Sequence, residues 1–102
     1  MIDAEHLARL PARSEKGLLH AFIECPKGNT HKIDLDKKLG IFRWALELPE
    51  GLTFPANFGF IPATMAPDGD ALDVLVLTGG PLPSGTLVDI RPVAILRMEQ
   101  EE

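Results

Sequence analysis

Nine glycines and nine prolines divide this chain of 102 residues into short segments, and no alternation of strand, helix and strand is visible. Turn-forming residues at this frequency favour short strands joined by turns. A chain of this length has room for one modest core but not for two. We therefore expect a single, mostly β domain over residues 1–102, either a small barrel or a sandwich.

The segment boundaries predict the individual elements. Asp3 can cap a short N-terminal helix that runs through residues 4–10 and ends at Pro11. Residues 31–36 alternate polar and apolar, which predicts a half-buried strand with Ile33 and Leu35 inward. The remaining strands are expected over residues 18–24, 41–48, 72–78 and 86–98.

Two segments have special features. Residues 72–78 are apolar on both faces, which predicts a central strand, whereas residues 49–67 are aromatic and rich in turn formers. Pro92 lies inside the last expected strand and predicts a bulge or a bend there.

Composition argues against several classes of protein. The formal net charge of −5 is unlike that of proteins that bind a nucleic-acid backbone, which usually carry a basic face. Cys25 is the only cysteine, so it cannot form an internal disulfide. The start of the chain is acidic, and no run approaches the roughly 20 apolar residues of a membrane helix. We expect a cytoplasmic protein with neither nucleic acid nor membrane as a partner.

Three carboxylates, Asp68, Asp70 and Asp73, lie within six residues, immediately before the apolar run 74–77. A buried carboxylate must shift its pKa, find a partner or hold a metal. The nearest basic residues, Arg43 and Arg91, are distant in sequence, so Mg²⁺, which takes oxygen ligands, is the natural counter-charge. The alternative is a solvated turn. The spacing does not match a calcium loop, and one cysteine with three scattered histidines does not form a zinc site.

Charge is unevenly placed along the chain. Residues 27–43 contain four lysines and Arg43, whereas residues 44–90 contain six acids and neither lysine nor arginine. This pattern is typical of two solvated surfaces of opposite sign. It also fits a cleft in which cations face metal-binding acids, as a polyanionic ligand bridged by a metal would require.

Several segments resemble the soluble Mg²⁺-dependent inorganic pyrophosphatases. The similarity covers residues 18–98 and keeps the order and spacing of the family's segments. It is carried by residues 23–28, 32–36, 54–62, 68–76 and 85–98, of which the fourth contains the acidic cluster.

The resemblance implies a fold and a chemistry. The fold is a small, closed or partly open β-barrel of the OB-like type, and the activity is Mg²⁺-dependent hydrolysis of pyrophosphate to two phosphates. Asp70 would orient or deprotonate the attacking water, and Lys32 and Phe58 would lie against the substrate. The implied metal ligands are Asp68, Asp70, Asp73, Glu24 and Asp34. The resemblance also implies a homo-oligomer.

This chain departs from the family pattern at several positions. Leu46 stands where the family has a phosphate-binding arginine, and Phe54 and Phe58 stand where it has tyrosines. Gln100 replaces an aspartate, and the family's C-terminal part, with a further metal-binding aspartate and substrate-binding lysines, has no counterpart here. Since one preorganised donor can contribute ~10²–10³ in turnover, we expect weak or lost hydrolysis. The alternative is a non-catalytic module that binds Mg²⁺ or phosphate, or that assembles into an oligomer through an uncovered apolar face.

Overall fold

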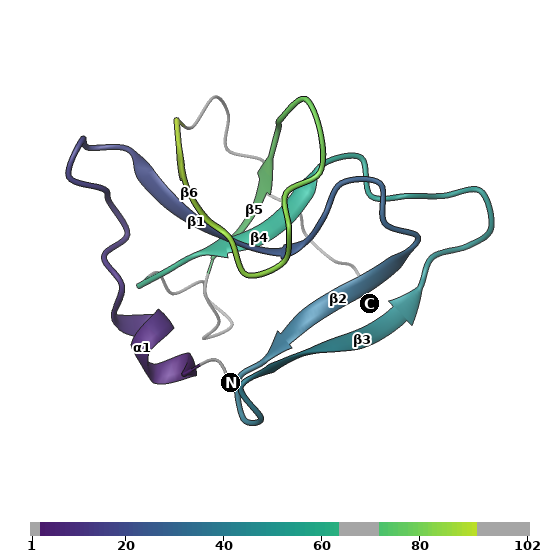
Figure 1. The fold of residues 1–102 in the computed structure, drawn as a ribbon, viewed down its shortest axis with the longest axis horizontal. Coiled ribbons are helices and arrows are strands. Elements are labelled where there is room, and N and C mark those ends of the chain that lie inside the picture. Colours follow the sequence, from purple (N-terminus) through teal and green to yellow (C-terminus); the bar gives the residue numbers. More distant parts are fainter. Residues whose placement is uncertain (1–2, 64–71, 92–102) are drawn as a thin grey trace.

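The structure is a computed structural model that describes residues 3–63 and 72–91. It is mostly β, with one short helix at the N-terminal end (Figure 1). The elements are α1 (Ala4–Arg9), β1 (Leu19–Cys25), β2 (His31–Asp36), β3 (Ile41–Glu47), β4 (Asn57–Ile61), β5 (Leu72–Val76) and β6 (Leu87–Ile90).

The described strands form two antiparallel sheets. Four of them lie in the order β5-β4-β1-β6, and β2 pairs with β3 in a separate hairpin beside that sheet (Figure 1). Within the described residues the two sheets are not joined into a closed barrel, so the partly open form of the expected architecture applies.

The core lies on both faces of β1. On one face Phe22 packs with Phe60, Leu7 of α1 and Leu35 of β2. On the other face Ala21 and Ile23 pack with Val76. Full burial of side chains of this size contributes about 1.5–3 kcal/mol each, so β1 is the strand around which the domain is built.

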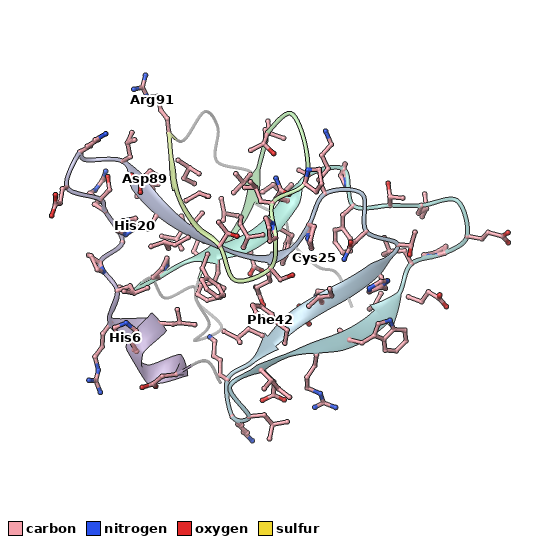
Figure 2. The ribbon with its side chains drawn as sticks, viewed as in Figure 1. His6, His20, Cys25, Phe42, Asp89 and Arg91 are labelled. Carbon is pink, nitrogen blue, oxygen red and sulfur yellow. The ribbon has the colours of Figure 1, made fainter. Side chains whose placement is uncertain are left out.

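Aromatic contacts join the hairpin to the sheet. Phe42 of β3 points from the hairpin toward the sheet, and its ring stacks on that of Phe22 with 6.0 Å between centroids (Figure 2). The Phe22 ring also contacts that of Phe60 at 5.2 Å. The hairpin is therefore anchored through Leu35 and Phe42, its two residues in this core.

The N-terminal helix follows the sequence prediction closely. Asp3 caps it, because its Oδ1 accepts a hydrogen bond from the backbone N–H of His6 at 3.3 Å. The helix ends at Arg9, shortly before Pro11. No helix in the described ranges is long and apolar enough to cross a membrane.

The segment expected to be turns contains a strand, β4, that the sequence reasoning missed. Asn and Gly are depleted in strands, so Asn57 and Gly59 argued against a strand here. Here Asn57 is fully buried: its amide donates to Val76 O and Thr78 Oγ1, and its Oδ1 accepts from Lys27 N and Leu82 N. These four bonds tie two loops to β4 and compensate the poor strand propensity.

The strand expected at 72–78 is present as β5 over Leu72–Val76, and its central position stays a prediction. β5 lies at an end of the described four-stranded sheet and pairs there with β4. Its residues Leu72 and Leu75 are exposed, so their apolar character does not reflect packing within the described residues. The expected strand at 86–98 is present as β6 over Leu87–Ile90. Residues 86 and 91 lie just outside this strand, and the predicted part from Pro92 to residue 98 lies outside the described residues.

Candidate functional site

A pocket of about 470 Å³ lies between the hairpin and the sheet. Its walls carry charges of both signs around an aromatic floor. The acids are Glu24, Asp34, Asp36 and Asp73, the lysines are Lys32, Lys37 and Lys38, and the apolar residues are Leu35, Phe58 and Phe60.

Five of the residues predicted from the sequence line this pocket: Glu24, Lys32, Asp34, Phe58 and Asp73. They come from four strands, and their convergence depends on the antiparallel register. Asp68 and Asp70 lie outside the described residues, so their predicted roles stay predictions.

Strand alternation explains which side chains face the pocket. On the sheet, Phe22, Glu24, Phe60 and Asp73 share one face, because Phe22 and Asp73 are both paired with Phe60, and Glu24 lies two residues beyond Phe22. The same face therefore carries the core near α1 and the acids of the pocket. The pocket continues the core toward the hairpin.

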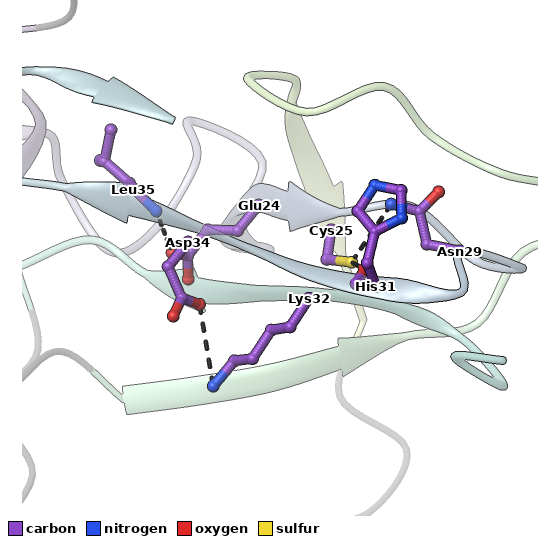
Figure 3. A network of polar contacts seen from close by, with 7 residues as sticks. All are labelled: Glu24, Cys25, Asn29, His31, Lys32, Asp34 and Leu35. Carbon is purple, nitrogen blue, oxygen red and sulfur yellow. Dashed lines mark hydrogen bonds and ion pairs between the residues drawn. The ribbon is translucent and has the colours of Figure 1, made fainter. Parts of the chain in front are cut away.

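Glu24 is the buried acid of the site, with 8% of its surface exposed. Its Oε2 accepts a hydrogen bond from the backbone N–H of Leu35 at 2.8 Å (Figure 3). Burial raises the pKa of the Glu24 carboxyl against the effect of that hydrogen bond, and the charges of Asp34 and Asp73 raise it further. A nearby cation of the protein or a bound metal would favour the ionised form.

Lys32 lies at the centre of the pocket's charges. Its Nζ is 3.8 Å from an Asp34 carboxylate oxygen (Figure 3) and 5.8 Å from the centre of the Phe58 ring. Both partners of the ion pair are partly exposed, so the pair adds little to stability. Directly opposite Lys32 on β3 is Leu46, an exposed apolar side chain.

Asp36 has a structural task at the end of β2. Its Oδ1 accepts hydrogen bonds from the backbone N–H groups of Lys38 and Leu39, both at 2.9 Å, and its Oδ2 is 3.2 Å from Arg43 Nη1. The bond from Leu39 and the contact with Arg43 lower the pKa of the Asp36 carboxyl. Asp36 therefore fixes the turn that carries Lys37 and Lys38.

The donor chemistry fits a magnesium ion only in part. Glu24, Asp34 and Asp73 offer the carboxylate oxygens that this hard cation prefers. In residues 3–63 and 72–91, however, no three His, Cys, Asp or Glu side chains lie close enough together to hold a metal. The full predicted ligand set includes Asp68 and Asp70, which the structure does not describe.

The expected cleft between opposite charges has a counterpart in this pocket. All three lysines come from the basic segment 27–43, as the sequence suggested. The acids are distributed differently: among the described residues, Asp73 alone comes from the acidic segment, whereas Glu24, Asp34 and Asp36 come from β1 and β2.

Sequence reasoning gave no individual role to Lys37, Lys38 and Phe60. The two lysines follow Asp36 directly and precede the turn at Gly40, so they lie next to residues already assigned to the site. That proximity was the available signal.

A second pocket of about 410 Å³ lies away from these residues. It surrounds His20, whose Nδ1 is 2.6 Å from Pro11 O and whose Nε2 is 3.5 Å from Asp89 Oδ1. Figure 2 shows His20 and Asp89 on the side of the molecule away from the hairpin. These contacts hold the segment after α1 against β1 and β6, and none of the predicted site residues lies there.

The sequence model of the family described as "Inorganic pyrophosphatase" matches residues 21–102. Curated relatives carry the same description. The inorganic pyrophosphatase of Thermus thermophilus is 42% identical over 85 residues, which are 83% of this chain and 49% of that protein. The inorganic pyrophosphatase of Sulfolobus acidocaldarius is 36% identical over 92 residues, 90% of this chain and 53% of that protein.

Solved structures agree with the sequence matches. The crystal structure of inorganic pyrophosphatase from Thermus thermophilus superposes with a TM-score of 0.77 at 40% identity, over 83% of this chain and 49% of that one. The enzyme structure from Ehrlichia chaffeensis gives a TM-score of 0.75 at 32% identity, over 82% of this chain and 55% of that one. The chain thus spans about half the length of the relatives it matches.

Proposed function

Because this chain belongs to the inorganic pyrophosphatase family, we propose that it binds pyrophosphate with Mg²⁺ in the pocket between hairpin and sheet and hydrolyses it to two phosphates. The observation that carries the proposal is the convergence of Glu24, Lys32, Asp34 and Asp73 from three strands, β1, β2 and β5, on one pocket. A mixed lining of lysines and carboxylates suits a polyanion that binds together with a divalent cation.

The proposed roles follow from side-chain chemistry. Lys32 binds a phosphate oxygen, since an ammonium group acts as a point charge with three donors. Asp70 accepts the proton of the attacking water, and Glu24, Asp34, Asp68 and Asp73 provide oxygens for Mg²⁺. When bound, Mg²⁺ would neutralise phosphate charge and make the water more acidic.

The departures at Leu46 and Phe58 bear on the rate. Leu46 lies opposite Lys32 without a donor, and Phe58 presents a ring without a hydroxyl to the pocket. Phosphoryl transfer depends on positioning and charge stabilisation, so fewer donors mean slower hydrolysis. We propose a turnover below that of the relatives that this chain matches.

Phosphate release from pyrophosphate with Mg²⁺ tests the proposal. Wild type should release phosphate, and Asp70→Asn should lower the rate by ~10²-fold or more, because the water loses its base. Asp89→Asn, which makes the same change on β6 outside the pocket, should leave the rate unaltered. Equal rates for all three proteins, or no release above background, would refute hydrolysis by this chain.

A second candidate function, a non-catalytic assembly module, is supported by the exposed apolar surface of the hairpin. Trp44 is 62% exposed and Leu46 46% exposed, with Leu39 and Ile41 nearby on the same hairpin. Such surface favours an interface between copies. Light scattering tests this candidate: a Trp44→Lys variant should shift an oligomer toward monomer, whereas a monomeric wild type would refute it.

The single domain over 1–102 and the cytoplasmic location stay predictions.

A further inference from the structure

Two lysines of the pocket lie over two phenylalanine rings in the same way. Lys32 Nζ is 5.8 Å from the centre of the Phe58 ring, and Lys37 Nζ is 5.7 Å from that of Phe60. Phe58 and Phe60 are two residues apart on β4, so their side chains share one face and are separated by about 6.6 Å along the strand. Two ammonium groups therefore lie in succession along one wall of the pocket.

Two features fix the position of Lys37. The Phe60 ring attracts the Lys37 ammonium group through its π-face. Asp36 fixes the backbone turn that carries Lys37 by accepting hydrogen bonds from Lys38 and Leu39, and Gly40 closes the turn with a φ of 67° that favours glycine. The backbone that carries Lys37 is thereby constrained, although the side chain belongs to an exposed residue.

The two lysines differ in their carboxylate contacts. Lys32 has Asp34 at 3.8 Å. The carboxylate of Asp36, next in sequence to Lys37, is engaged by the turn and by Arg43. A ring contact uses the charge of the Lys37 ammonium but leaves its N–H groups able to donate to an anion.

We infer that Lys37 is a second phosphate-binding residue of the pocket, so that Lys32 and Lys37 each bind one phosphoryl group of a diphosphate. The inference rests on the proposed function and deepens it. Lysine is a common binder of phosphate, and two fixed ammonium groups favour a ligand with two phosphoryl groups over orthophosphate. Lys37, on the hairpin side of the pocket, thus favours diphosphates over orthophosphate as ligands.

The test is a calorimetric titration with two probes in the presence of Mg²⁺: methylenediphosphonate, a diphosphate analogue that resists hydrolysis, and orthophosphate. Lys37→Gln should weaken methylenediphosphonate about tenfold, the loss of one charge-assisted contact, and orthophosphate less than about twofold. Lys37→Arg should restore most of the affinity. Lys27→Gln, the same charge change at an exposed residue that does not line this pocket, should alter neither affinity.

Other results separate the inference from the proposed function. If Lys32→Gln weakens both probes while Lys37→Gln behaves like Lys27→Gln, the role of Lys37 is refuted and the proposed function stands. If Lys37→Gln weakens both probes equally, Lys37 contributes general charge and the recognition of two phosphoryl groups is refuted. If wild type binds neither probe, the proposed function fails, and the inference fails with it. Because Lys37 is exposed, the fold should persist in the variant, which circular dichroism verifies.

Discussion

Strands β1 and β3 are packed in opposite ways. From Ala21 to Cys25 every residue of β1 is buried, whereas Phe42 is the only residue of β3 that is not exposed. The pocket takes one wall from the sheet around β1 and the other from the hairpin that contains β3. One wall thus belongs to the core, and the other is attached to it through few contacts.

Because of this difference, substitutions in the two walls should affect different properties of the protein. Changes in the sheet wall disturb backbone pairing and the core, so they should act first on the free energy of unfolding. Substitutions on the hairpin should leave that free energy nearly constant and change the affinity or the turnover of the ligand. Predictions at three positions test this division, in order of decreasing effect on stability.

The largest effect is expected at Gly59, in the middle of β4. A Cβ atom at this position would come within 2.0 Å of the carbonyl oxygen of Phe22, on the backbone of β1. Neither strand can move away without breaking the β1–β4 register. Gly59→Ala should therefore cost about 4 kcal/mol or more and leave the protein largely unfolded.

Urea denaturation followed by circular dichroism measures this loss. Gly79→Ala is the matched control, because a Cβ there meets no atom within 4 Å among the described residues. It should change the free energy of unfolding by less than about 0.5 kcal/mol. Comparable stability of the two variants would contradict the close approach of β1 and β4.

The same position shows why part of the fold was predictable and part was not. Alternation of polar and apolar residues indicated β2, and the Asp3 cap and Pro11 indicated the helix α1, because these signals are local in the sequence. Such local signals could not indicate β4, since Gly59 is required by the backbone of Phe22 in β1, which is distant in sequence. The place of β5 in the sheet likewise depends on which strands pair with it, and hydropathy does not encode that pairing.

An intermediate effect is expected at Glu24, where the two walls meet. Glu24→Ala removes the acceptor of the Leu35 N–H and should cost about 1–3 kcal/mol. Glu24→Gln keeps an acceptor oxygen and removes the charge, so it should avoid the loss of stability caused by Glu24→Ala, while Mg²⁺ affinity falls. Glu50→Gln, at an exposed residue outside the pocket, is the control for both measurements.

The pH dependence of stability distinguishes the charge of Glu24 from its hydrogen bond. Burial raises the pKa of Glu24 in the native state above its value in the unfolded chain. Between these two values the native state binds more protons, so its stability falls as pH rises. In metal-free buffer Glu24→Gln should gain stability relative to wild type as pH increases through this interval, and then run parallel to it. A constant difference at every pH would contradict the buried charge.

The site residues were predicted by a different route from the strands. Glu24, Lys32, Asp34 and Asp73 were assigned through family resemblance, and they converge on one pocket because register brings them there. Lys37 had no such signal, since its place depends on the ring of Phe60 on β4, across the pocket from the hairpin. Contacts between segments distant in sequence decided both cases, and only a resemblance could anticipate them.

The smallest effect on stability is expected at Leu46 on the hairpin. It lies directly opposite Lys32, where side chains on paired strands are about 5 Å apart, and it is exposed. Leu46→Arg should change the free energy of unfolding by less than about 0.5 kcal/mol. It would place a guanidinium group beside the Lys32 ammonium, where it can form paired hydrogen bonds to a phosphate. Turnover of Mg²⁺-pyrophosphate should then rise about tenfold or more.

Leu52→Arg is the matched control, since it makes the same substitution at an exposed leucine in a loop that does not line the pocket. A general gain in positive charge would raise association with pyrophosphate in both variants, and salt would screen it. A donor opposite Lys32 would act in Leu46→Arg alone and persist at higher salt. Equal rates in the two variants would show that hydrolysis is limited elsewhere, and that the hairpin wall does not control the ligand as its contacts predict.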